Sequence, residues 1–60
     1  MFTVNISTDN AAFEDNAGFE VARILRKLAD RVEDWPGAND FSIGLLDANG
    51  NKVGKALGRK

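Results

Sequence analysis

The sequence predicts a small α+β domain with the order β-α-β-β, in which one amphipathic helix packs on a three-stranded sheet. Three patterns lead to this fold class. Apolar and polar residues alternate near the N-terminus, apolar residues recur at helical spacing in the middle, and two short apolar segments flank an Asn-Gly turn near the C-terminus. A chain of 60 residues forms one domain, residues 1–60, around one core.

The first strand is expected at residues 2–7, where three apolar residues share one face: Phe2, Val4 and Ile6. Turn-forming residues 8–10 end it. Residues 11–14 favour a single helical turn. Asn16 is a suitable N-cap for the next helix, because its side-chain oxygen accepts from free backbone N–H groups of the first turn.

The helix is expected near residues 17–35, and it is strongly amphipathic. One side of its helical wheel holds the apolar residues Val21, Ile24, Leu25, Leu28, Val32 and Trp35. The opposite arc holds the charged residues Glu20, Arg23, Arg26, Lys27, Asp30, Arg31, Glu33 and Asp34. Pro36 ends the helix, because its ring disfavours α geometry at the residue before it.

Residues 41–46 and 52–57 are expected to form a hairpin, for which two registers are possible. A two-residue turn at Asn49-Gly50 would bring small residues onto the buried face: Gly54 and Ala56. A three-residue loop with Gly50 in the left-handed region would bring larger ones: Val53 and Leu57. The second register buries more apolar surface and is preferred. The last residues, 58–60, are expected to fray.

The composition argues against a catalytic or metal site. The chain has no cysteine and no histidine, which removes disulfides, thiolate metal sites and the commonest general base. Asp47 begins a stretch that superficially suggests a calcium loop, but glycine stands at its fourth position and Gly58 at its twelfth, where a bidentate carboxylate is needed. We therefore expect no enzyme, no cofactor and no metal.

Five residues are candidates for a protein-interaction site. Arg23, Lys27 and Arg31 form a basic row at i,i+4 spacing, which suits phosphate binding but is more typical of a solvated helix face. Phe19 falls inside the polar arc of the helix. It either folds back on Phe13 as a small satellite cluster or belongs to a contact surface.

Three stretches carry a resemblance to known proteins. They are Thr8-Asp9-Asn10-Ala11-Ala12-Phe13, then Val21-Ala22-Arg23-Ile24-Leu25 with Leu28-Ala29, then Leu46-Asp47-Ala48-Asn49-Gly50-Asn51-Lys52-Val53-Gly54. In this order and spacing they resemble a group of very short proteins encoded by bacteriophages and prophages. No functional residue carries over. The resemblance implies a small phage accessory protein, cytoplasmic in the infected bacterium, that binds and inhibits or modulates a host or defence protein.

The leading hypothesis is a non-enzymatic interaction protein that forms a homodimer, because a core of this size is marginal without disulfides or metals. One alternative is a nucleic-acid binder that uses the basic row and the basic C-terminal residues Lys52, Lys55, Arg59 and Lys60. Another is a protein that sequesters a nucleotide between protomers. No apolar run approaches the roughly 20 residues of a membrane span, so no membrane partner is expected.

Overall fold

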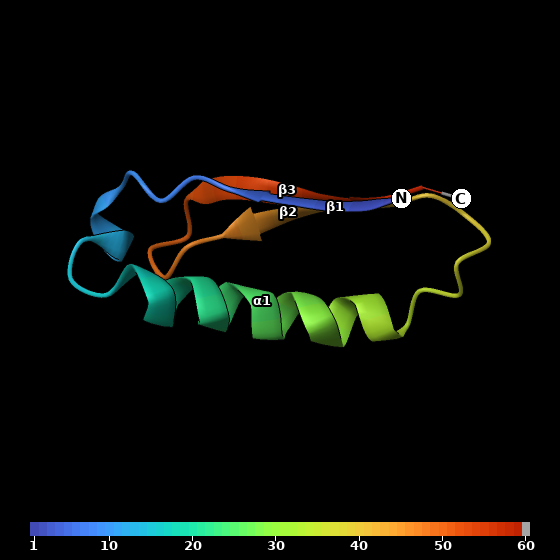
Figure 1. Cartoon of the computed structure of the whole chain (residues 1–60), viewed down its shortest axis with the longest axis horizontal. Coiled ribbons are helices and arrows are strands. Elements are labelled where there is room, and N and C mark those ends of the chain that lie inside the picture. The colour runs from blue at the N-terminus through green and yellow to red at the C-terminus, as the bar shows by residue number, and fades with distance from the viewer. Residues whose placement is uncertain (60) are drawn as a thin grey trace.

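Three strands and two helical segments build the chain in the computed structural model, which describes residues 1–59. They are β1 (Phe2–Ile6), the 3-10 helix η1 (Ala11–Phe13), α1 (Ala17–Glu33), β2 (Phe41–Leu46) and β3 (Lys52–Gly58). The sheet has the order β1-β3-β2, and both neighbouring pairs are antiparallel. The helix α1 runs along one face of this sheet (Figure 1). The predicted α+β class and β-α-β-β order are confirmed.

The helix begins at its predicted N-cap, but it ends at Glu33, two residues before the expected end at residue 35. The side chain of Asn16 accepts a hydrogen bond from the backbone N–H of Phe19 at 3.0 Å, which satisfies one of the free donors of the first turn. Asp34 caps the other end, two residues before Pro36. Both ends of α1 are therefore fixed by local chemistry.

The hairpin combines a loop that the sequence predicts with a bulge that it does not. Gly50 donates its N–H to the Asp47 carbonyl at 3.1 Å and has φ 85°, as a three-residue loop requires. Further on, Leu45 lies opposite Gly54 while Leu46 lies opposite Lys52. Val53 is therefore an extra residue, which makes a β-bulge.

Because of the bulge, the register preferred from the sequence is only partly right. Val53 is buried as expected, but the expectation that Leu57 shares its face is wrong. Beyond Val53 the side chains of β3 again alternate between the two faces of the sheet, but shifted by one residue. Ala56 therefore faces the core and is fully buried. Leu57 lies opposite Ser42 on the other face of the sheet.

Met1 and Arg59, the first and last described residues, lie side by side (Figure 1). Arg59 donates its backbone N–H to the Met1 carbonyl at 2.8 Å, and its guanidinium pairs with Asp40 at 3.1 Å. Gly58 belongs to β3 and is buried. The expected fraying is therefore wrong for residues 58 and 59, because Gly58 pairs with Phe2 of β1 and Arg59 is hydrogen-bonded to Met1. Lys60 lies outside the described residues.

The core is thin. Its buried hydrophobic residues are Phe13, Ile24, Leu28, Leu45, Val53 and Ala56. A second group is only partly buried against them: Val4, Ile6, Ala12, Val21, Val32, Phe41 and Ile43. One helix covers only part of the apolar face of a three-stranded sheet, so much of that face stays partly accessible.

An aromatic cluster closes the end of the sheet that is remote from the hairpin loop. The rings of Phe2, Trp35 and Phe41 have centroids 5.6 to 5.9 Å apart. Gly58 makes room for them, since a Cβ there would lie 2.5 Å from a ring carbon of Trp35. The indole of Trp35 also donates to the Asn39 carbonyl at 2.6 Å. This cluster ties the C-terminal end of α1 to the sheet.

Candidate protein-binding surface

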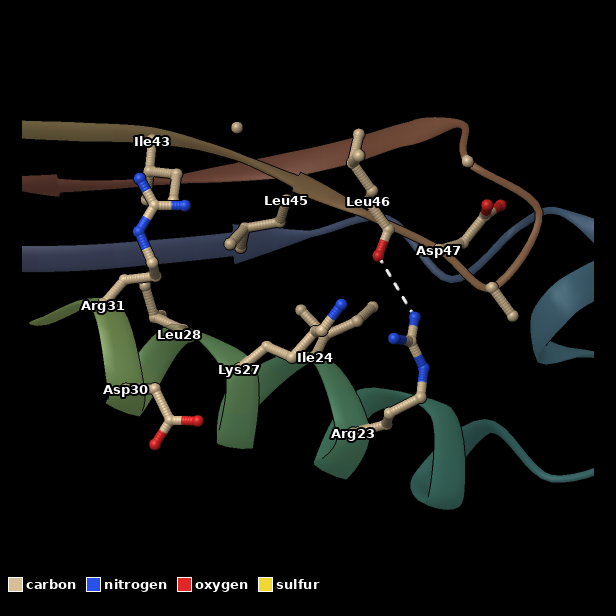
Figure 2. Close-up of a pocket in the computed structure, with 13 residues that line it drawn as sticks. Arg23, Ile24, Lys27, Leu28, Asp30, Arg31, Ile43, Leu45, Leu46 and Asp47 are labelled. Atoms are coloured by element: carbon tan, nitrogen blue, oxygen red, sulfur yellow. Dashed lines mark hydrogen bonds between the residues drawn. The ribbon is translucent and has the colours of Figure 1, made fainter.

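A groove of about 490 Å³ runs between α1 and the edge strand β2. Its helix side carries the basic row, Arg23, Lys27 and Arg31, and its strand side includes Gly44 and Leu46. Buried side chains form its floor: Ile24, Leu28 and Leu45. The groove exists because the strand order places β2 at the edge, directly beside the helix (Figure 2).

Lys27 and Arg31 of the basic row are exposed, as a solvated helix face predicts, and the row also borders the groove. All three side chains line the groove, and Figure 2 shows Arg31 extending from α1 in the direction of β2 and Arg23 turned toward the Leu46 carbonyl. That last contact is a hydrogen bond of 3.2 Å from Arg23 Nη2. The row is thus a boundary of a groove between two elements.

The charges of this row are not equally available to a ligand. Arg23 makes a two-point contact with Glu20, with Nε donating at 2.9 Å and Nη2 at 2.8 Å. Within residues 1–59, neither Lys27 nor Arg31 forms an ion pair. The cationic charge that a ligand would meet therefore comes from Lys27 and Arg31.

Glu20 was expected on the exposed polar arc, and the structure corrects this: only 5% of the residue is exposed. The hairpin loop folds over the first turn of α1, and Glu20 Oε2 accepts the backbone N–H of Ala48 at 2.7 Å. The hydrogen bonds from Arg23 lower the pKa of the Glu20 carboxyl below its ordinary value, although burial opposes them. Glu20 is therefore ionised at neutral pH.

Asp47 lies in the hairpin loop that contacts Glu20, and only 4% of the residue is exposed. Its carboxylate holds this loop together. Its Oδ1 accepts the backbone N–H groups of Asn49 and Asn51 at 2.9 and 2.8 Å, and its Oδ2 accepts the amide of Asn10 at 2.7 Å. Burial raises the pKa of Asp47, but these hydrogen bonds together outweigh it and lower the pKa. Asn10 in turn caps η1 through the Ala12 N–H, so Asp47 joins the loop to η1.

Both buried carboxylates are thus anionic and already bonded to structural donors. Neither is poised to give or take a proton at neutral pH, which is what general acid–base catalysis needs. In the part of the chain that the structure describes, no three acidic residues come together as a metal site. The surface offers a ligand charged side chains, backbone groups and apolar contacts.

The two candidate phenylalanines lie in different environments. Phe13 is buried in the core and does not reach the surface. Phe19 is 68% exposed, so the two rings do not form the satellite cluster that was one expectation. Phe19 stands four residues before Arg23, which continues the i,i+4 ridge toward the N-terminal end of α1. Of the five candidates, four follow this ridge and one belongs to the core.

Comparisons of the chain with protein-family models, with curated proteins and with solved structures found no match. No helix within residues 1–59 is both long and apolar enough to cross a membrane.

Proposed function

We propose that this chain is a non-enzymatic binding protein that attaches to another protein. In the phage context that the resemblance implies, the partner is a host or defence protein that it inhibits or modulates. The observation that carries the proposal is Phe19, a large aromatic side chain left 68% exposed on the polar face of the helix. Aromatic residues in such positions often dominate the energy of protein association.

The backbone beneath this ring is held by hydrogen bonds, which supports a binding role. The Phe19 N–H donates to the Asn16 cap, and the next residue, Glu20, is locked to Arg23 and to the hairpin loop. A ring presented from a fixed backbone loses less conformational entropy on binding than one on a mobile loop.

Self-association is part of the proposal. The partly buried residues around the core leave apolar surface that a second copy could cover, and small domains without disulfides or metals often use oligomerisation in this way. We therefore propose a homodimer that binds its protein target in the bacterial cytoplasm.

The test is capture of a defined partner from a bacterial host lysate, followed by reconstitution of the purified pair. The parent protein should bind it stoichiometrically, and Phe19→Ala should lose it. Leu25→Ala is the matched control, since Leu25 is also an exposed apolar residue of α1 but lies away from the ridge. Equal binding by Phe19→Ala and the parent would refute the role of this surface, and the absence of any stoichiometric partner would refute the function.

A second candidate, nucleic-acid binding, is favoured by one observation: Lys27 and Arg31 line the groove and form no ion pair within residues 1–59. It predicts association with oligonucleotides that falls steeply with added salt. Nucleic-acid binding is disfavoured because Glu20 neutralises the charge of Arg23 and because a carboxylate, Asp30, also lines the groove. The nucleotide-sequestering alternative predicts instead that a nucleotide raises the melting temperature.

A further inference from the structure

We propose that the groove beside β2 binds an extended acidic segment of the protein partner. The segment would add to the sheet as a fourth strand and place acidic side chains at alternate positions against Lys27 and Arg31. This inference rests on the proposed function, because it names the chemistry of the partner that such a function requires.

The first support is the free edge of β2. In the described chain this strand pairs only with β3. The Leu46 carbonyl accepts from the Arg23 side chain, so the backbone groups of Leu46 point toward the open edge. Backbone direction in a strand alternates with a period of two, so Gly44 and Ser42 present their N–H and C=O groups to the same edge. An unpaired edge of this kind is a template for another strand.

The second support is the match between helix and strand spacing. Lys27 and Arg31 are four residues apart, which is about 6 Å along a helix axis. Alternate residues of a strand are about 6.7 Å apart and point to the same face. Figure 1 shows α1 running lengthwise beside the sheet, so the two cations would face successive helix-side residues of an added strand.

The charges at the groove favour an acidic occupant over a basic or neutral one. Lys27 and Arg31 are unpaired within the described residues, whereas Arg23 already has Glu20. Asp30 also lines the groove, but Figure 2 shows its carboxylate directed away from β2. An added strand would therefore meet the cations before it meets this carboxylate.

The opposite face of the added strand would be apolar. Leu46, the residue after the buried Leu45, is 53% exposed on the face of the sheet away from α1. A neighbouring side chain on that face of the new strand could cover it. The structure thus favours a partner segment that alternates acidic residues with apolar, β-branched ones.

A second copy of this chain fits the edge poorly. Its strands, FTVNI, FSIGLL and KVGKALG, contain no acidic residue. Pairing of β2 with β2 around a two-fold axis would also bring two basic rows together, which is repulsive. A nucleic acid would meet the same cations but cannot satisfy the alternating donors and acceptors of the strand edge.

The probe is a short blocked peptide in which glutamate alternates with valine, titrated into the isotope-labelled full chain and followed by amide NMR shifts. The largest shifts should fall on residues 42–46 and around Lys27 and Arg31. The double variant Lys27→Gln/Arg31→Gln should bind roughly tenfold or more weakly. Arg26→Gln is the matched control, an exposed arginine of α1 outside the groove, and it should bind like the parent.

Two further peptides separate strand addition from simple charge attraction. A version with glutamine for glutamate should bind weakly, and one with N-methylated backbone amides at alternate positions should lose binding with its charge unchanged. Equal binding of the N-methylated peptide, no binding of the glutamate peptide at millimolar concentration, or shifts located elsewhere would each overturn the inference. A captured host protein that still binds the double variant would also overturn it, yet leave the proposed function standing.

Discussion

The carboxylate of Glu20 accepts the backbone N–H of Ala48 at 2.7 Å, which joins the first turn of α1 to the hairpin loop across 28 residues of sequence. The same carboxylate holds Arg23, whose guanidinium reaches the Leu46 carbonyl at the edge of β2. One acidic side chain therefore connects the helix, the loop and the edge strand, and it fixes one end of the proposed binding groove.

Glu20→Gln should lower the melting temperature, because the amide cannot replace both charge-assisted contacts with Arg23 and leaves that guanidinium without its counter-charge. Thermal unfolding followed by circular dichroism measures the effect. Glu33→Gln, at an exposed position near the end of the same helix, is the control and should change the melt little. Equal melts for the two variants would show that the Glu20 contacts do not stabilise the fold.

Stability should fall on acidification. The pKa values of Glu20 and Asp47 are lowered from ordinary values of 4.5 and 3.8, so folding favours their ionised forms. Their contribution is fully present above the ordinary values and is lost as pH falls through the lower, folded-state pKa values. Melts should be steady from neutral pH to about 5 and decline below about 4. A melting temperature that rises on acidification below pH 5 would contradict the hydrogen bonding described for both groups.

Gly50→Val should destabilise the hairpin. Gly50 has φ 85°, and a β-branched residue held there costs on the order of 1–3 kcal/mol. Gly18→Ala is the matched control, because Gly18 lies in α1 and a Cβ there meets only one atom, at 3.9 Å. That change should raise stability by about 0.5–1 kcal/mol. Chemical denaturation compares the two, and an unchanged midpoint for Gly50→Val would show that the left-handed conformation is not required.

The sequence predicts local structure well and the contacts between elements poorly. The ends of β2 at residues 41 and 46 follow from alternation, and the start of α1 follows from its Asn16 cap. Glu20 could not be recognised as buried, because a helical wheel ranks positions on one helix and says nothing of a loop that folds over it. Leu57 was misplaced because alternation cannot reveal the extra residue at Val53.

The basic row illustrates the same limit for the candidate site. The i,i+4 spacing of the row is visible in the sequence, but the element that lies across the groove from it is not. That element is β2, which lies at the edge of the sheet because the strand order is β1-β3-β2. Hairpin signals in the sequence do not determine this order. Phe13 was similarly ambiguous, since its burial depends on how η1 packs against α1.

The isolated protein should be a dimer, because the core contains few fully covered residues and lies at the size where small domains need further support. Light scattering on a sizing column gives the mass directly. The melting temperature should also rise with protein concentration, since folding and association are then linked. A monomer mass at tens of micromolar together with a cooperative melt would rule this out.

Truncation to alanine should unfold the domain at Leu28 but leave it folded at Phe19. Leu28 is buried on the apolar side of α1, and Leu→Ala in a core typically costs about 2–5 kcal/mol, enough to unfold a domain this small. Phe19 is 68% exposed, and surface changes are usually within about 0.5 kcal/mol. Phe19→Ala should therefore keep the circular dichroism spectrum and nearly keep the melt, while losing the captured partner.

The pair of variants separates a contact surface from a structural role. If both unfold alike, Phe19 supports the fold through contacts that its exposure does not reveal, and the loss of binding carries no information about a surface. If Phe19→Ala folds and also binds like the parent, the contact surface lies elsewhere on the chain. Only a folded Phe19→Ala that has lost its partner, beside an unfolded Leu28→Ala, agrees with a ring held outward by the Asn16 cap to meet another protein.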